Sequence, residues 1–371
     1  MGAVVLTTVV DNDVLALIGY GAVVAAGGGG AGLTVPVRTG KRKGVIVSAT
    51  SNETFVGVAV AGAAGGNAGV AGVVNTGVFN NTVHAIIYGG GRIDADSNDD
   101  SEGDLQTFAS SDSDIYLVSG SLSAAGSVGV GASVTVLTYN KDIVASVNAY
   151  RAGEVHAHDV QVIAGDKRSP YGITNNLDES TAATDDLYIF SVSISAGGTA
   201  VGAGATVLYF EDSTTAELGG SVQASGDVIV AALNDSHLIN AAGAVGASGS
   251  ASVSGIVAVT YFNATTTAKA GAGAAIVAAG GVTINANSIE RIDADVLGIT
   301  GSGSASVSGT IAVVVTGVTT KAFIADSDEA GAKCTVTAAS LSVLAKDSYT
   351  LLGIAGTAAI AGQAGDRKAH V

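Results

Sequence analysis

Two groups of side chains have the types and the spacing of possible metal ligands. The first lies in residues 89–104, which read GGGRIDADSNDDSEGD and place oxygen ligands alternately at Asp94, Asp96, Asn98 and Asp100. Alternating oxygen ligands are typical of calcium-binding loops. The EF-hand pattern fails, because its sixth position holds Asp99 instead of Gly and its twelfth holds Leu105 instead of Glu. Weak calcium binding is one interpretation, and a solvated acidic loop is the other.

The second group is Glu154, His156 and His158, which alternate with Val155 and Ala157. In a strand the two apolar side chains point inward, so the other three point outward together and could bind zinc or copper. An ordinary polar strand face explains the same pattern. A looser acidic group, Asp178, Glu179, Asp185 and Asp186, is a further calcium candidate, again with a solvated loop as the alternative.

Nothing in the sequence predicts catalysis. Serines are frequent, but they recur with the strand period, and Gly249-Ser250-Ala251-Ser252-Val253 resembles a nucleophile elbow only superficially. The five histidines are scattered, and the glycine run 27–30 is not followed by the Lys-Ser/Thr of a phosphate loop. We therefore expect that the protein is not an enzyme and has no cofactor, calcium excepted.

Composition excludes several partners. The net charge is −16 and the pI about 4.4, so the surface repels nucleic acid. Cys334 is the only cysteine, which excludes an intrachain disulfide. Uncharged runs such as 187–210 and 238–268 are long enough for transmembrane helices, but they are dense in Gly, Ser, Thr and Val and alternate with period two. We interpret them as a buried strand layer and expect no membrane span.

The elements that must position these side chains are strands. Residues 248–255 read SGSASVSG and recur unchanged at 302–309, with serine at every second position. A period of two is that of a strand and does not fit a helix. Exact recurrence after 54 residues indicates stacked copies of one unit.

Six short apolar strands mark the starts of these units, at Val45, Leu105, Val160, Val228, Val282 and Leu341. Their spacings are 60, 55, 68, 54 and 59 residues, which indicates that insertions lie in loops. The predicted units are 2–44 (partial), 45–104, 105–159, 160–227, 228–281, 282–340 and 341–371 (partial), with loop insertions at 29–44 and 165–187.

The predicted fold is all-β: one array, 1–371, forming a parallel β-solenoid (β-helix) of about six units of 54–68 residues. The handedness and the number of coils per unit stay open. Residues 2–28 match 255–281 without a gap, so the two ends of the array share a phase. Open parallel edges are templates for association, and the self-association candidates are Val4, Leu6, Leu352, Ile354 and Ile360.

The units resemble a known family. The succession at 227–231, 242–259, 263–268 and 275–281 is similar to the repeats of giant bacterial filamentous surface adhesins, including leukotoxin-type ones. The resemblance implies an exported stalk or adhesive fibre, and it implies no catalytic residues.

The sequence thus favours a structural or adhesive protein of the extracellular bacterial surface. It is a slice of a giant chain that contacts adjacent repeats, or a subunit that self-assembles head-to-tail into a filament. The alternatives are a calcium- or carbohydrate-binding surface module and a membrane-active, leukotoxin-like segment.

Overall fold

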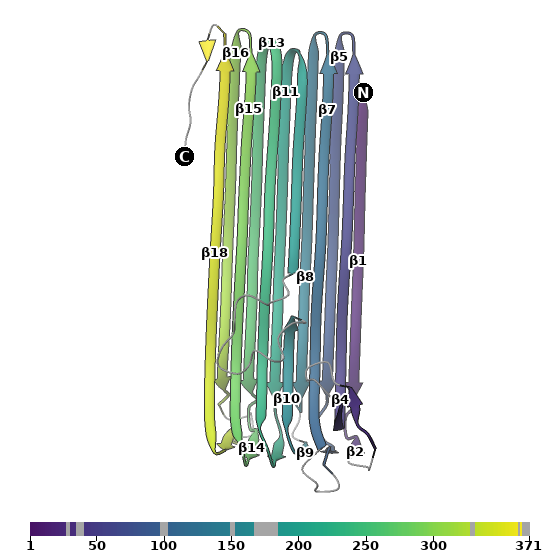
Figure 1. Cartoon of the computed structure of the whole chain (residues 1–371), viewed down its shortest axis with the longest axis vertical. Coiled ribbons are helices and arrows are strands. Elements are labelled where there is room, and N and C mark those ends of the chain that lie inside the picture. The colour runs from purple at the N-terminus through teal and green to yellow at the C-terminus, as the bar shows by residue number, and fades with distance from the viewer. Residues whose placement is uncertain are drawn as a thin grey trace.

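The chain forms β-strands throughout the part that the structure describes. This computed structural model describes residues 1–26, 30–34, 41–96, 103–148, 153–166, 185–326, 331–362 and 364–365. Very long strands run side by side, joined by tight turns at one end, and short strands lie at the other end (Figure 1). The expectation of an all-β protein is confirmed.

The predicted β-solenoid is wrong. The strands are grouped into a large 13-stranded sheet, in which the pairing is parallel except at one short edge strand, and a parallel 6-stranded sheet, instead of a series of short-stranded coils. The longest strand runs for 43 residues without a break. The period-two pattern continues beyond the short apolar strands that begin the repeats, so consecutive stretches merge into continuous ladders.

The large sheet folds over so that its two halves face each other. Layer A consists of β4 (Lys41–Gly65), β7 (Gly103–Ala125), β10 (Val160–Asp166), the first halves of β11 (Asp185–Leu218) and β13 (Val228–Ala270), β15 (Gly281–Ser302) and β18 (Ser340–Ala361). Layer B consists of β1 (Gly2–Ile18), β5 (Ala68–Ile87), β8 (Val128–Val147), the second halves of β11 and β13, and β16 (Ala305–Ile324). The pairing of β11 shows this folding directly, because its residues 186–196 pair with β7 in layer A and its residues 199–218 pair with β8 in layer B.

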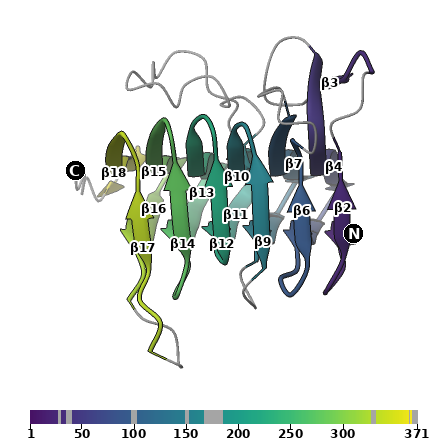
Figure 2. The ribbon, with the colours of Figure 1, turned by 90° about the horizontal axis from the view of Figure 1, so that it is seen from below.

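The 6-stranded sheet lies across the end of the layers opposite the tight turns (Figure 2). Its strands are β2 (Val23–Ala25), β6 (Arg92–Asp94), β9 (Glu154–Ala157), β12 (Ser221–Ala224), β14 (Ala275–Ala278) and β17 (Thr335–Thr337). Two short strands remain, β3 (Leu33–Thr34), antiparallel to the start of β4, and β19 (Ala364–Gly365), parallel to the start of β16.

The register of layer A aligns equivalent positions of the repeats. Direct pairing links the six residues that begin the repeats, in the order Val45, Leu105, Val160, Val228, Val282 and Leu341. The corresponding series in layer B is Gly2, Ala71, Gly131, Gly202, Ser254 and Ser308. Equivalent positions of the repeats therefore stack on one another across neighbouring strands.

The interior changes character along the strands. Nearest the 6-stranded sheet it is an aliphatic core that includes Val83, Ile143, Val155 and Val222. Next comes a large-side-chain core in which Tyr139, Phe210 and Phe262 stack in successive strands, with ring centroids 5.6 and 5.0 Å apart. Burial of these rings and aliphatic side chains is the main stabilising term of the fold.

Beyond the aromatic core, toward the tight turns, the interior is built from small and hydroxyl side chains. Ser252 and Ser254 are buried, whereas Val253 between them is 44% exposed. The uncharged runs are thus not a wholly buried layer, because every second side chain faces outward. Hydroxyl pairs join neighbouring strands and the two layers, as between Ser133 and Ser191 (2.7 Å) and between Ser119 and Thr135 (2.7 Å).

Candidate functional site

The calcium and zinc candidates of the sequence meet at one place. Asp94 on β6 lies beside His156 on β9, with its Oδ1 3.2 Å from the imidazole Nδ1, and it also accepts a hydrogen bond from Arg92 at 3.0 Å. Asp96 is buried. Asn98 and Asp100, the other two members of the predicted calcium group, lie outside the described residues.

The other members of the histidine group do not converge on this contact. His158 Nδ1 lies 2.9 Å from the hydroxyl of Ser225, and Glu154 is exposed, paired in register with Arg92. Val155 and Ala157 are buried, as the strand alternation predicts. No cluster of three or more His, Cys, Asp or Glu side chains within the described ranges could hold a metal ion.

The second acidic group is divided between the interior and the surface. Asp178 and Glu179 are outside the described residues. Asp186 faces outward, with Oδ1 3.2 Å from Nδ1 of His237 on the neighbouring strand. Asp185 points the other way and is buried. This carboxylate belongs to a network that the sequence analysis did not predict.

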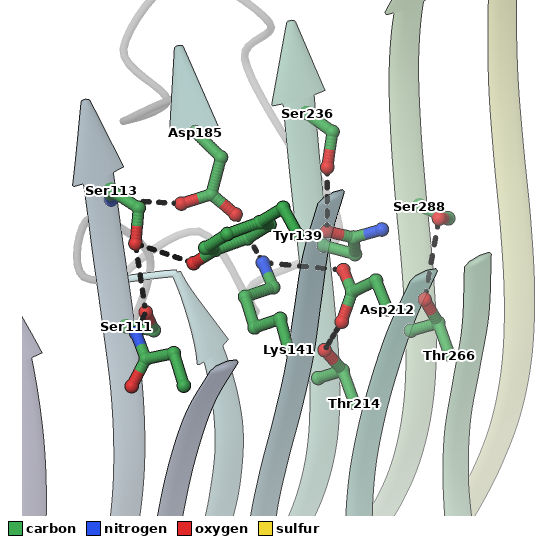
Figure 3. A network of polar contacts seen from close by, with 12 residues as sticks. Ser111, Ser113, Tyr139, Lys141, Asp185, Asp212, Thr214, Ser236, Thr266 and Ser288 are labelled. Atoms are coloured by element: carbon green, nitrogen blue, oxygen red, sulfur yellow. Dashed lines mark hydrogen bonds and ion pairs between the residues drawn. The ribbon is translucent and has the colours of Figure 1, made fainter. Parts of the chain in front are cut away.

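A belt of polar side chains crosses the interior between the two apolar cores (Figure 3). We call it the polar belt: Glu53, Ser113, Asp185, Ser236 and Glu290 from layer A, and Asn12, Asn81, Lys141 and Asp212 from layer B. The strand parity that buries Ile143 and Tyr139 also buries Lys141, which lies between them.

Lys141 is the centre of the polar belt. Its ammonium group contacts Asp185, and it lies 3.2 Å from Oδ2 of Asp212, with all three side chains fully buried. The backbone N–H of Ser113 donates to Asp185 at 2.9 Å, and the hydroxyl of Thr214 donates to Asp212 at 3.2 Å. One buried cation thus compensates two carboxylates, each of which has a further donor, as buried charges require.

Hydrogen bonds extend the belt on both sides of Lys141. The hydroxyl of Tyr139 lies 2.6 Å from that of Ser113, and Asn81 donates to Ser111 at 2.8 Å. Asn12 on β1 donates to Glu53 at 2.8 Å. Farther along, Thr266 donates to Ser288, which contacts Glu290. The polar side chains therefore tie successive strands and both layers together.

Burial shifts the protonation of the belt in one direction. Burial raises the pKa of Asp185 and Asp212, and the charge of Lys141 opposes this shift. Burial and the nearby carboxyl group of Asp347 raise the pKa of Glu290 to about 8, although a hydrogen bond from Ser288 opposes this shift. The pKa of Tyr139 is raised too, so its phenol stays protonated. The carboxyl groups of the belt therefore bind protons more tightly than free carboxyl groups do.

The second candidate site is the pair of sheet edges. In the described residues β1 pairs only with β5, and β18 only with β15. β16 has β13 on one side and only the two residues of β19 on the other. Rows of backbone donors and acceptors along these edges are available for parallel pairing.

The self-association candidates lie on these edges but face different ways. Val4 and Leu6 on β1 pack inward against Ala59, Ala71 and their neighbours. Leu352, Ile354 and Ile360 on β18 are exposed, by 48, 54 and 68%. The layer that contains β1 ends at β16, and the layer that contains β18 begins at β4, so an added unit would place β1 on β16 and β4 on β18.

Within the described ranges, no helix is long and apolar enough to cross a membrane. Comparison of the chain with protein-family models, with curated proteins and with solved structures finds no match.

Proposed function

We propose that this chain is a structural protein of the extracellular bacterial surface, forming part of an adhesive fibre or stalk. The observation that carries the proposal is the in-register parallel pairing of equivalent positions in both layers and in the 6-stranded sheet. Within the described residues, the edge strands of each of these three ladders are unpaired on their outer side over most of their length, and the two edge strands of a ladder occupy equivalent positions. A further unit of the same kind can continue all of them at once.

The register specifies how continuation would occur. In layer B, Gly2 takes its place in the series that ends at Ser308, so a following β1 would lie beside residues 308–324. In layer A a following Val45 would lie beside Leu341, and in the 6-stranded sheet Val23 would lie beside Thr335. The three junctions can form together, because each ladder has six strand positions, one of which in layer A is shared by β10 and the first half of β11.

The continuing unit is an adjacent repeat of a longer chain or a second copy of this one. In both cases stability comes from hydrogen-bonded ladders and from side chains stacked at equivalent positions, so function as a rigid spacer requires no ligand. The high negative charge favours solubility of such a long apolar array.

Cryo-electron microscopy of the purified chain over a range of concentrations tests this function. Six strands at about 4.8 Å each predict an axial repeat of about 29 Å per copy in any fibre. Fibres with this repeat would support self-assembly, and single copies about 29 Å thick along the stacking direction would support a segment of a longer stalk. Compact particles that lack stacked parallel strands would contradict a structural role.

A further inference from the structure

The molecule is divided along its strands into a charge-free half and a charged half. The charge-free half, toward the tight turns, consists of residues 2–10, 55–79, 115–139, 187–210, 238–262, 296–316 and 351–362, which contain no Asp, Glu, Lys, Arg or His. Charges begin directly beyond it in both layers, at Asp11, Asp114, Asp186 and Glu211. Because equivalent positions stack across the strands, the charge-free stretches of all repeats lie together at one end of the molecule.

The outward side chains of this half are apolar on both faces. On layer A they include Val192, Ile194 and Leu297, and on layer B Val253, Val257 and Ile311, with exposed fractions of 38–57%. The interior between the faces holds buried serines such as Ser193 and Ser254. Exposed apolar surface of this extent marks a protein or membrane contact.

Tyrosines lie at the boundary between the two halves. Tyr116 and Tyr188 pack together on layer A, with ring centroids 5.0 Å apart, and Tyr209 and Tyr261 stack on layer B at 4.8 Å. Their hydroxyl groups contact the charged half, since Tyr209 donates to Glu211 at 2.9 Å and Tyr188 lies 3.1 Å from Nδ1 of His237. An apolar ring with a hydrogen-bonded polar tip suits the boundary between lipid and water.

The height of the charge-free half matches a bilayer. A strand such as β7 contributes residues 115–125, and eleven extended residues measure about 36 Å. The hydrocarbon core of a bilayer is about 30 Å thick. Backbone groups of the inner strands are paired within the ladders, as hydrocarbon requires. Face-to-face packing of a second copy would cover one apolar face, whereas lipid covers both.

We propose that the charge-free half enters the hydrocarbon region of a lipid bilayer, with the tyrosines at the interface and the acidic half outside. Uncharged, zwitterionic lipid is the expected partner, because the acidic half repels anionic headgroups. In lipid the outer backbone groups of the edge strands β1, β4, β16 and β18 also need partners, which the stacking under the proposed function would supply. The insertion rests on that proposed function in this respect, and microscopy without lipid tests the stacking separately.

Tryptophan reporters test the insertion, since the chain has no Trp of its own. We would compare Val253→Trp, in the charge-free half, with Thr267→Trp, on the same face of β13 in the charged half. With phosphatidylcholine vesicles we expect a blue shift and quenching by brominated acyl chains for the first variant and neither for the second. Absence of quenching at position 253 would overturn the proposal.

Vesicle flotation supplies a second, independent measurement. The double variant Val192→Lys, Val253→Lys places charges on both apolar faces, and each lysine is expected to weaken flotation at least about tenfold. Thr265→Lys in the charged half should leave flotation unchanged, and melting curves verify that the exposed substitutions preserve the fold. Loss of self-association in lipid-free sedimentation, without any flotation of the native chain, would instead identify a second copy as the occupant.

Discussion

At the scale of single residues, the buried ammonium of Lys141 has the largest expected effect on stability. The variant Lys141→Met leaves the carboxylates of Asp185 and Asp212 buried without a cation. We expect the free energy of unfolding to fall by about 3–5 kcal/mol, the usual cost of breaking a buried ion pair. Denaturant unfolding followed by circular dichroism measures this loss.

A matched control is the outward-facing pair of Lys269 and Glu217, whose charged atoms lie 3.0 Å apart and whose side chains are 28 and 16% exposed. Lys269→Met should cost less than Lys141→Met, because water reaches the outward pair and ion pairs in contact with solvent contribute about 1 kcal/mol or less. Adding Asp185→Asn and Asp212→Asn to Lys141→Met should recover much of the loss, since no buried charge then remains. Equal losses at positions 141 and 269 would show that the interior charges are hydrated.

At the scale of elements, the junction of β1 with β16 determines whether copies can stack. In a head-to-tail stack the outward Val5 of one copy would lie beside the outward Ile311 of the next. Both side chains are well exposed in the single chain, so substitution there leaves the fold intact. The variant Val5→Lys, Ile311→Lys should abolish fibres through repulsion across the junction.

The charge-swapped variant Val5→Lys, Ile311→Glu is the control for this junction. Opposite charges directly across a strand pair are favourable, so fibres should form again in low salt and weaken in high salt. Sedimentation velocity distinguishes the two variants. If both assemble equally, copies do not meet through β1 and β16.

The sequence predicted the presence of the strands better than the way in which they are grouped into sheets. The serine-valine alternation in 248–259 predicts a strand, and the structure confirms it. Strand parity alone does not say which face is buried, and here the serines are inside. The grouping into a 13-stranded and a 6-stranded sheet was not predicted either, because the period-two pattern does not show at which residue a strand stops pairing with its neighbour.

The candidate site was less predictable for a physical reason. Lys141 and Asp185 are ordinary charged residues in the sequence, and only their phase with Tyr139 and Leu187 indicates burial. Their compensation depends on a contact between strands 44 residues apart in the chain. Asp94 and His156, assigned to separate metal candidates, meet because β6 and β9 are neighbours in the 6-stranded sheet.

At the scale of the whole molecule, the buried carboxylates give stability a single pH trend. The pKa values of Asp185, Asp212 and Glu290 are all raised by burial, that of Glu290 from 4.5 to about 8. A carboxyl group with a raised pKa in the folded state binds more protons there than in the unfolded chain, so stability falls as pH rises between the two values. For Glu290 this window extends from about 4.5 to 8.

The variant Glu290→Gln isolates this contribution. Gln cannot ionise, so the variant should melt above the native chain at pH 8.5. The difference should shrink steadily as the pH falls from about 8 toward 5, where the unfolded chain also begins to bind the proton. Thermal melts at half-unit pH intervals measure the difference in melting temperature between the variant and the native chain. Both chains become more stable as their net charge falls toward the pI, and this common effect cancels in the difference. A difference that does not depend on pH would mean that Glu290 is ionised in the folded state throughout this range. The trend has a consequence for a surface fibre, because mild acid would then strengthen the interior that joins its strands.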